Sequence, residues 1–207
     1  LTGELHRKIE QKYYDLSSQG FRVLGVSYKK VKEEKTQYSI NDESDMVFLG
    51  FVAFLDPPKE TARGSLQLLS KYGVELKILT GDNELVTRTT CEQLGFEIKG
   101  IVPGSELAQM PEDALLRVVE KTNIFARVTP AQKDRIMNAL KNNGHVVGFL
   151  GDGINDAPSL KTSDVSMSVE NAVDVAKESA DIILLHKDLT VLGEGVLEGR
   201  QTFGNTM

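Results

Sequence analysis

The sequence predicts an α/β fold built on a parallel sheet, and three observations lead to that prediction. Short apolar runs alternate along the 207 residues with segments whose apolar side chains recur at helical spacing. The run at 146–150 is almost continuously apolar, which is typical of a strand covered on both faces. This run ends in glycines and acids at 151–156, and open α/β sheets bind ligands at the carboxyl ends of their strands.

The amino-terminal part is predicted to hold one helix, one strand and a loop. Apolar residues at helical spacing in 5–16 are followed by Gly20, which ends that helix. Residues 21–28 alternate as a half-buried strand does, with Arg22 on the polar face. Residues 29–45 are charged and lack periodicity, so we expect an exposed loop or hairpin.

The remaining chain is predicted to alternate strands with helices. Two prolines end the first of these strands, and Gly73 and Gly95 stand where left-handed glycines end helices. Thr129 and Gln132 have the spacing of a capping box, with proline between them at the first helical position. The expected strands are 46–55, 74–79, 124–126, 146–150, 165–169 and 182–185. The expected helices are 60–72, 85–94, 111–121, one from Pro130 to about Asn143, one from Pro158, one near 173–178 and one from Asp188, while 96–110 is expected to be irregular with a turn at Pro103-Gly104.

Polar side chains follow two of the predicted strands. Thr80, Gly81, Asp82 and Asn83 stand at a strand-to-helix junction, where a hydroxyl and free backbone N–H groups suit an anion. The alternative is an Asx-type turn in which Asn83 or Asp82 caps the next helix. The sequence alone leaves both open.

The second polar cluster is Asp152, Asn155 and Asp156. Carboxylate and amide oxygens suit Mg²⁺ better than Zn²⁺, and Mg²⁺ usually completes its coordination with water and phosphate. The alternative is a polar turn that leads into a capped helix. An EF-hand is excluded because the required glycine and glutamate positions hold Ala157 and Ser163, and a P-loop is excluded because the chain has no Gly-Lys pair.

Lys133 lies in the first turn of a predicted helix. A cation there opposes the helix dipole unless an anion lies nearby, although an ordinary surface lysine is the alternative.

Composition sets limits on function. The 24 basic and 30 acidic residues give a net charge of −6, which argues against a nucleic-acid partner. Cys91 is the single cysteine, so no disulfide framework is possible and a buried thiol is expected.

No apolar run approaches the roughly 20 residues that span a bilayer, so a soluble chain is expected. The start at Leu1 lacks a signal-peptide pattern and suggests a piece of a larger protein. The three histidines lack metal-like spacing, and none is predicted to be a ligand.

Four motifs together resemble the phosphorylation domain of P-type cation-transporting ATPases, whose fold is that of the haloacid dehalogenase superfamily. They are FLDPPK at 54–59, LTGDN at 79–83, ARVTPAQK at 126–133 and GDGINDAPSL at 151–160. The residues of these motifs are most similar to those of bacterial magnesium-transporting members. The resemblance implies a Rossmann-like parallel sheet with helices on both faces, preceded by a small remnant of an α+β nucleotide-binding domain. It implies the domain order 1–45 for that remnant, 46–190 for the phosphorylation domain and 191–207 for a helix leading toward a membrane segment.

The resemblance also implies roles for single residues. Asp152 would hold Mg²⁺, Thr80 and Gly81 would bind the transferred phosphoryl group, Lys133 would place a positive charge on it, and Asn155 and Asp156 would complete the site. Arg22 would lie near the ATP phosphates, Arg127 near the nucleotide, and Asp82 and Asp56 near the hinge and the ATP. Such a site works by positioning and charge neutralisation. The implied function is ATP hydrolysis coupled through an aspartyl-phosphate to cation transport, with Mg²⁺ as the expected cargo, at the cytosolic face of the cell membrane. The implied partners are ATP and the rest of the same polypeptide with its membrane helices.

One departure from the family is important. The motif Asp-Lys-Thr-Gly-Thr, which carries the phosphorylated aspartate, is absent from the sequence. We therefore expect the chain to be inactive alone, with a gap one strand wide between strands 74–79 and 146–150. Either those two strands would meet directly, or a strand from a second copy or from the chain's own amino-terminal segment would fill the gap. Two alternatives stay open: a free-standing phosphatase that uses Asp56, although Pro58 stands where its second aspartate belongs, and a non-catalytic module that binds Mg²⁺ or nucleotide.

Overall fold

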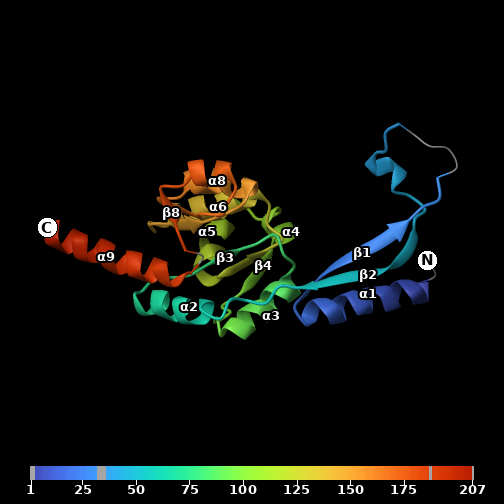
Figure 1. Ribbon diagram of the computed structural model, residues 1–207, viewed down its shortest axis with the longest axis horizontal. Coiled ribbons are helices and arrows are strands. Elements are labelled where there is room, and N and C mark those ends of the chain that lie inside the picture. The colour runs from blue at the N-terminus through green and yellow to red at the C-terminus, as the bar shows by residue number, and fades with distance from the viewer. Residues whose placement is uncertain (1–2, 32–35, 187, 207) are drawn as a thin grey trace. The chain divides into compact units, whose positions relative to one another are not determined.

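The structure, a computed structural model, describes residues 3–31, 36–186 and 188–206 (Figure 1). The chain folds as two compact units, Leu1–Pro57 and Pro58–Met207. The domain order 1–45, 46–190 and 191–207 stays a prediction, and the division between the two compact units falls one strand later than residue 45. The reason is that the strand after residue 46 pairs along its whole length with a strand of the first unit.

The first unit is a helix on a two-stranded antiparallel sheet. Its elements are α1 (Gly3–Ser18), β1 (Phe21–Tyr28), the 3₁₀ turn η1 (Ile40–Asp42) and β2 (Val47–Leu55). Arg22 on β1 pairs with Phe54 on β2, and the register shifts between Val26 and Ser27. The rings of Tyr13 and Phe51 join α1 to the sheet, with 6.3 Å between their centroids. The predicted helix and first strand are confirmed. Within the predicted loop 29–45, residues 32–35 lie outside the described part.

The second unit begins with three parallel strands in the order β3-β5-β4. They are β3 (Ile78–Leu79), β4 (Ile101–Pro103) and β5 (Ile124–Ala126), and the associated helices are α2 (Ala62–Lys71), α3 (Glu84–Leu94), α4 (Gly104–Leu107), α5 (Glu112–Lys121) and α6 (Pro130–Asn142). Figure 1 shows α2 and α3 below the strands labelled β3 and β4, and α5 and α6 above them. Phe125 of β5 packs in one core with Leu115 and Val119 of α5 and Ile136 of α6, and all four are fully buried.

Three further parallel strands form a second sheet, in the order β6-β7-β8. Its elements are β6 (Gly148–Leu150), the 3₁₀ turn η2 (Ile154–Asp156), α7 (Ala157–Thr162), β7 (Val165–Val169), α8 (Asp174–Glu178), β8 (Ile182–Leu184) and α9 (Thr190–Thr206). Leu160, Ala172 and Ala176 form its small core. α9 packs on α2 of the first sheet, and Gly193 lies against Leu68 so closely that a methyl group at Gly193 would overlap it.

The predicted α/β class is confirmed, with the parallel strands divided between two sheets. β3 and β6 are edge strands, and within the described chain they do not pair with each other. Of the expected ways to close the gap, direct pairing of these strands is therefore wrong, and so is filling by the amino-terminal segment, because β1 and β2 pair with each other in a separate sheet. Filling by a second copy stays a prediction. β3 and β6 are also shorter than the predicted 74–79 and 146–150, and Val146 is 82% exposed. An edge strand has a ladder on one side only, so fewer of its residues are held extended.

Of the other predictions about the fold, some are confirmed and one is wrong. Gly73 and Gly95 do end helices, with φ of 70° and 67°. The prediction that 96–110 is irregular is wrong, since β4 and α4 lie there. Cys91 is buried as expected, and burial raises the pKa of its thiol to about 11. Among the described residues, no helix combines the length and apolar character that crossing a bilayer requires.

Candidate functional site

The start of α6 is the centre of the candidate site. Thr129 caps the helix: its hydroxyl accepts a hydrogen bond from the backbone N–H of Gln132, and the Gln132 side chain accepts one from the N–H of Thr129. Pro130 occupies the first helical turn. The capping box predicted from the sequence is thus confirmed, and it fixes the direction in which the next residues leave the sheet.

The residues just before α6 hold the Thr80 loop through the backbone. The N–H of Val128 donates to the carbonyl oxygen of Thr80 at 3.0 Å, and the N–H of Arg127 donates to that of Asp82 at 2.9 Å. The Thr80 hydroxyl accepts a hydrogen bond from the N–H of Asp82, which curls the loop tightly. Gly81 is exposed at the tip of this loop.

Asn83 ends the same loop as a helix cap. Its side chain accepts a hydrogen bond from the N–H of Val86 at 2.9 Å, so the capping alternative is correct for Asn83. Capping α3 does not use the Thr80 side chain or Gly81. An anion site and a capped helix therefore fit in the same five residues.

Lys133 forms an ion pair with Asp156. Their side chains are 2.7 Å apart and only 14% and 13% exposed, so the surface-lysine alternative is wrong. The second oxygen of Asp156 accepts a hydrogen bond from the N–H of Gly153 at 3.1 Å. Lys133 also lies 5.9 Å from the centre of the Phe149 ring. The negative charge of Asp156 supplies the anion that a lysine at a helix start requires.

Asp152 and Asn155 lie in the same loop after β6, and both are exposed. The backbone carbonyl of Asp152 accepts a hydrogen bond from the N–H of Val173, which fixes the main chain at this position. No group of three His, Cys, Asp or Glu residues able to hold a metal occurs in the described ranges. One carboxylate beside one amide in an open loop fits Mg²⁺, which binds few protein oxygens and keeps several waters.

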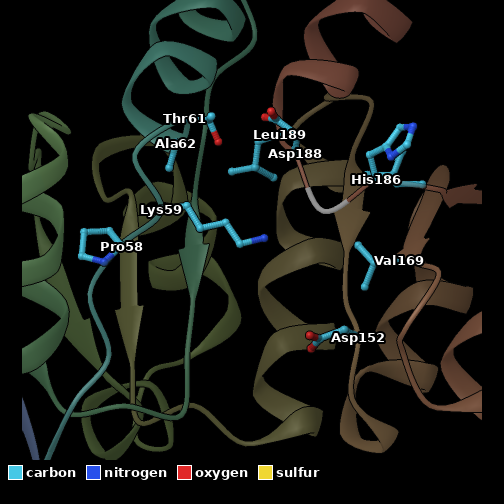
Figure 2. A pocket seen from close by; sticks show the side chains of 10 residues that line it. Pro58, Lys59, Thr61, Ala62, Asp152, Val169, His186, Asp188 and Leu189 are labelled. Atoms are coloured by element: carbon cyan, nitrogen blue, oxygen red, sulfur yellow. The ribbon is translucent and has the colours of Figure 1, made fainter.

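A cavity of about 380 Å³ opens beside Asp152 (Figure 2). Figure 2 shows the Lys59 amino group extending into this space from the segment before α2, with Asp152 across from it. Asp188 lines the same cavity, and a hydrogen bond from the backbone N–H of Thr190 lowers the pKa of its carboxyl. Neither Lys59 nor Asp188 was predicted from the sequence to have a role; for Lys59, the signal in the sequence is its place in the FLDPPK motif.

The structure thus holds Thr80 and Gly81 against the segment just before α6. Lys133, on the first turn of α6, pairs with Asp156 in the loop that also carries Asp152 and Asn155. Asp82 is half-buried in the Thr80 loop. Arg127 is exposed, lies 3.3 Å from Glu84 and has a φ of 51°, which is uncommon for a residue with a side chain. Arg22 and Asp56 belong to the first unit, on β1 and directly after β2.

Comparison with known proteins identifies relatives along the whole chain. Residues 1–61 match the family described as P-type ATPase, cytoplasmic domain N. Magnesium-transporting ATPase, P-type 1 of Escherichia coli K12 is 48% identical over 201 residues, which are 97% of this chain and 22% of that protein. A protein of the same name from Salmonella typhimurium LT2 is 50% identical over 207 residues, or 99% of this chain and 23% of that protein. A calcium-transporting ATPase of Listeria monocytogenes is 34% identical over 99% of this chain and 24% of its own length. The chain therefore spans less than a quarter of these relatives.

A solved structure shares the fold. It is described as the catalytic domain of the CPx-ATPase CopB-B, in a study of its conformational changes upon nucleotide binding, and the TM-score is 0.53 at 26% sequence identity. The match covers 74% of this chain and 50% of that one. The resemblance seen in the four motifs, including their likeness to bacterial magnesium-transporting members, is confirmed: over almost its whole length the chain is similar to one part of P-type cation-transporting ATPases.

Proposed function

We propose that this chain is part of the catalytic head of an ATPase that couples ATP hydrolysis, through an aspartyl-phosphate, to the transport of a cation, with Mg²⁺ as the first candidate. The observation that carries the proposal is the Lys133–Asp156 pair, which joins the start of α6 to the loop of Asp152. The relatives whose names include magnesium transport support the choice of cation. We place the head at the cytosolic face of the cell membrane, joined to the remainder of the polypeptide.

The proposed roles follow from the chemistry of each group. Thr80 and Gly81 offer a hydroxyl and a backbone N–H to a phosphoryl group, and Lys133 offers an ammonium that is already largely shielded from water. Asp152 and Asn155 would hold Mg²⁺, whose charge, when it is bound, neutralises phosphate oxygens. Asp156 would hold the Lys133 ammonium in place until the phosphoryl group arrives.

The nucleotide would be bound by residues farther from the transferred group. Arg127 and Asp82 lie on the two segments that hydrogen-bond each other beside Thr80. For Arg22 and Asp56, which belong to the first unit, contact with ATP is proposed from the family resemblance alone. Because the Asp-Lys-Thr-Gly-Thr motif is absent from these 207 residues, the chain alone is proposed to bind without turnover.

Calorimetry with Mg²⁺ in the presence of inorganic phosphate tests this proposal. We expect Asp152→Asn to weaken Mg²⁺ binding by about tenfold or more, because even residues behind a metal ligand typically contribute 10–100-fold. Asp174→Asn on α8 is the matched control, since Asp174 is 88% exposed and pairs only locally with Lys177. An identical isotherm for wild type and Asp152→Asn would remove Asp152 from the metal site.

A further inference from the structure

The two sheets of the second unit are joined by helices. β3 and β6 do not pair in the described chain, yet the candidate site takes Thr80 from beside the first sheet and Asp152 and Asp156 from beside the second. α6 packs against α7, and contacts between these two helices cross from one sheet to the other. We call this interface of α6 with α7 the seam. Some contact at the seam must therefore determine how far apart the two parts of the site lie.

Two polar contacts cross the seam side by side. The first is the ion pair of Lys133 with Asp156. The second is a hydrogen bond of 2.8 Å from the Ser159 hydroxyl to the Asp134 carboxylate. Lys133 and Asp134 are consecutive on α6, and Asp156 and Ser159 are three residues apart, which is close to one helical turn. Farther along the seam, Lys141 binds the carbonyl oxygen of Thr162 and the carboxylate of Asp164.

The two contacts differ in how tightly they fix the helices. Lysine has a long, flexible side chain, so its ammonium can follow Asp156 over a range of helix positions. Serine and aspartate are short, so their hydrogen bond forms only at one separation of the two backbones. Ser159 has no exposed surface, and a buried hydroxyl that loses its partner cannot turn to water instead.

We propose that Asp134 and Ser159 are positioning residues for Lys133. Their hydrogen bond holds α6 against α7 at the separation at which the Lys133 ammonium reaches Asp156. If an anion at Thr80 and Gly81 draws the ammonium away from Asp156, the Asp134–Ser159 bond persists and keeps the Asp152 loop in place. Only this last step depends on the function proposed above.

Hydrogen exchange of the Lys133 ammonium, followed by ¹H–¹⁵N NMR, tests the positioning directly. The signal is assigned by its loss in Lys133→Met. Ser159→Ala and Asp134→Ala should each speed exchange about tenfold, the effect of losing one hydrogen bond to a charged group. Asp134→Asn should restore slow exchange, because an amide oxygen still accepts from Ser159.

Ser166→Ala is the matched control. Ser166 is also buried, at 3% exposed, and its hydroxyl donates to the Asp181 carboxylate at 2.6 Å, away from α6. This variant loses the same kind of bond, together with the one that the hydroxyl accepts from the N–H of Asp181. It should still leave exchange at Lys133 unchanged. Equal acceleration in Ser159→Ala and Ser166→Ala, or none in Ser159→Ala, would overturn the proposal. Should Ser159→Ala fail to fold, the two Asp134 variants still decide the question.

Binding of Mg²⁺ with inorganic phosphate separates this inference from the proposed function. We expect about tenfold weaker binding in Ser159→Ala than in Ser166→Ala. If Ser159→Ala speeds exchange at Lys133 but the wild type does not bind phosphate, the positioning role is supported and the proposed function is rejected. Wild-type binding that Ser159→Ala leaves unchanged would reject the positioning of the site.

Discussion

β5 and β6 each lead into one part of the candidate site, but they are stabilised differently. β5 has neighbours on both sides, and its three residues have no exposed surface. β6 has β7 on one side only; Gly148 is exposed, and Phe149 and Leu150 are partly so. The predicted strand 124–126 agrees with β5 at every residue, whereas the predicted 146–150 loses its first two. The length of a strand that is paired on both sides can therefore be predicted from its own sequence. The length of an edge strand also depends on how far its single neighbour pairs with it.

Truncating one ring in each strand should give the largest difference. Phe125→Ala removes a fully buried ring and should lower the free energy of unfolding by about 3–5 kcal/mol. Phe149→Ala removes a partly exposed ring at the edge and should cost about half of that. Urea denaturation of both variants measures the difference. Equal losses would show that β6 is as firmly packed as β5, against our comparison.

Glycine substitutions offer a second, smaller test. A methyl group at Gly104, directly after β4, would overlap the carbonyl oxygen of Arg127 and the side chain of Gln132. Gly104→Ala should therefore lower the unfolding free energy by about 1–3 kcal/mol. At Gly148 on β6 the nearest atom would be the end of the Met167 side chain at 3.5 Å, an ordinary contact. Gly148→Ala should leave the urea midpoint almost unchanged, and a large loss there would reverse the expected order.

The smallest effect should come from a carboxylate beside the edge strand. The N–H of Val147 and then Lys141 hold the pKa of Asp164 below its ordinary value. A lowered pKa in the folded state stabilises the protein above the unfolded pKa, and this stabilisation is lost as the pH falls through the folded pKa. Asp164→Asn should therefore melt below wild type at pH 7, and the two curves should converge in acid.

Thermal melting across the acidic range measures that convergence. Asp174→Asn serves as the control, because its ion pair with Lys177 is local to α8 and solvent-exposed. A gap in melting temperature that persists at the lowest pH would show that Asp164 acts through packing instead of charge.

Local chemistry was the part of the fold that the sequence predicted best. The cap at Thr129 and Gln132 and the glycines that end α2 and α3 depend on residues within one turn, and all were found where expected. β4 and α4 were missed because Pro103-Gly104 has the composition of a turn. Gly104 is needed there for a contact with Arg127, 23 positions later in the chain, which no local pattern reveals.

The site was predictable to the same extent. A lysine in the first turn of a helix left two possibilities open, a nearby anion or an ordinary surface position, and the structure supplies the anion in Asp156. Which residue would serve, and that Asp134 would bind Ser159 beside it, depend on how α6 meets α7. The left-handed conformation of Arg127 has no sequence cue either, because it is imposed by the hydrogen bond to Asp82 and the packing of Gly104.

The start of α6 also sets the spacing between the two loops of the site. Val128 holds one loop through its backbone, and Lys133, five residues later, holds the other through its side chain. Each residue of a helix adds about 1.5 Å of rise and about 100° of rotation. A single residue inserted between Gln132 and Lys133 would turn the ammonium away from Asp156 while leaving the cap formed by Thr129 and Gln132 in place. The length of this segment is therefore under stricter constraint than the identity of most side chains within it.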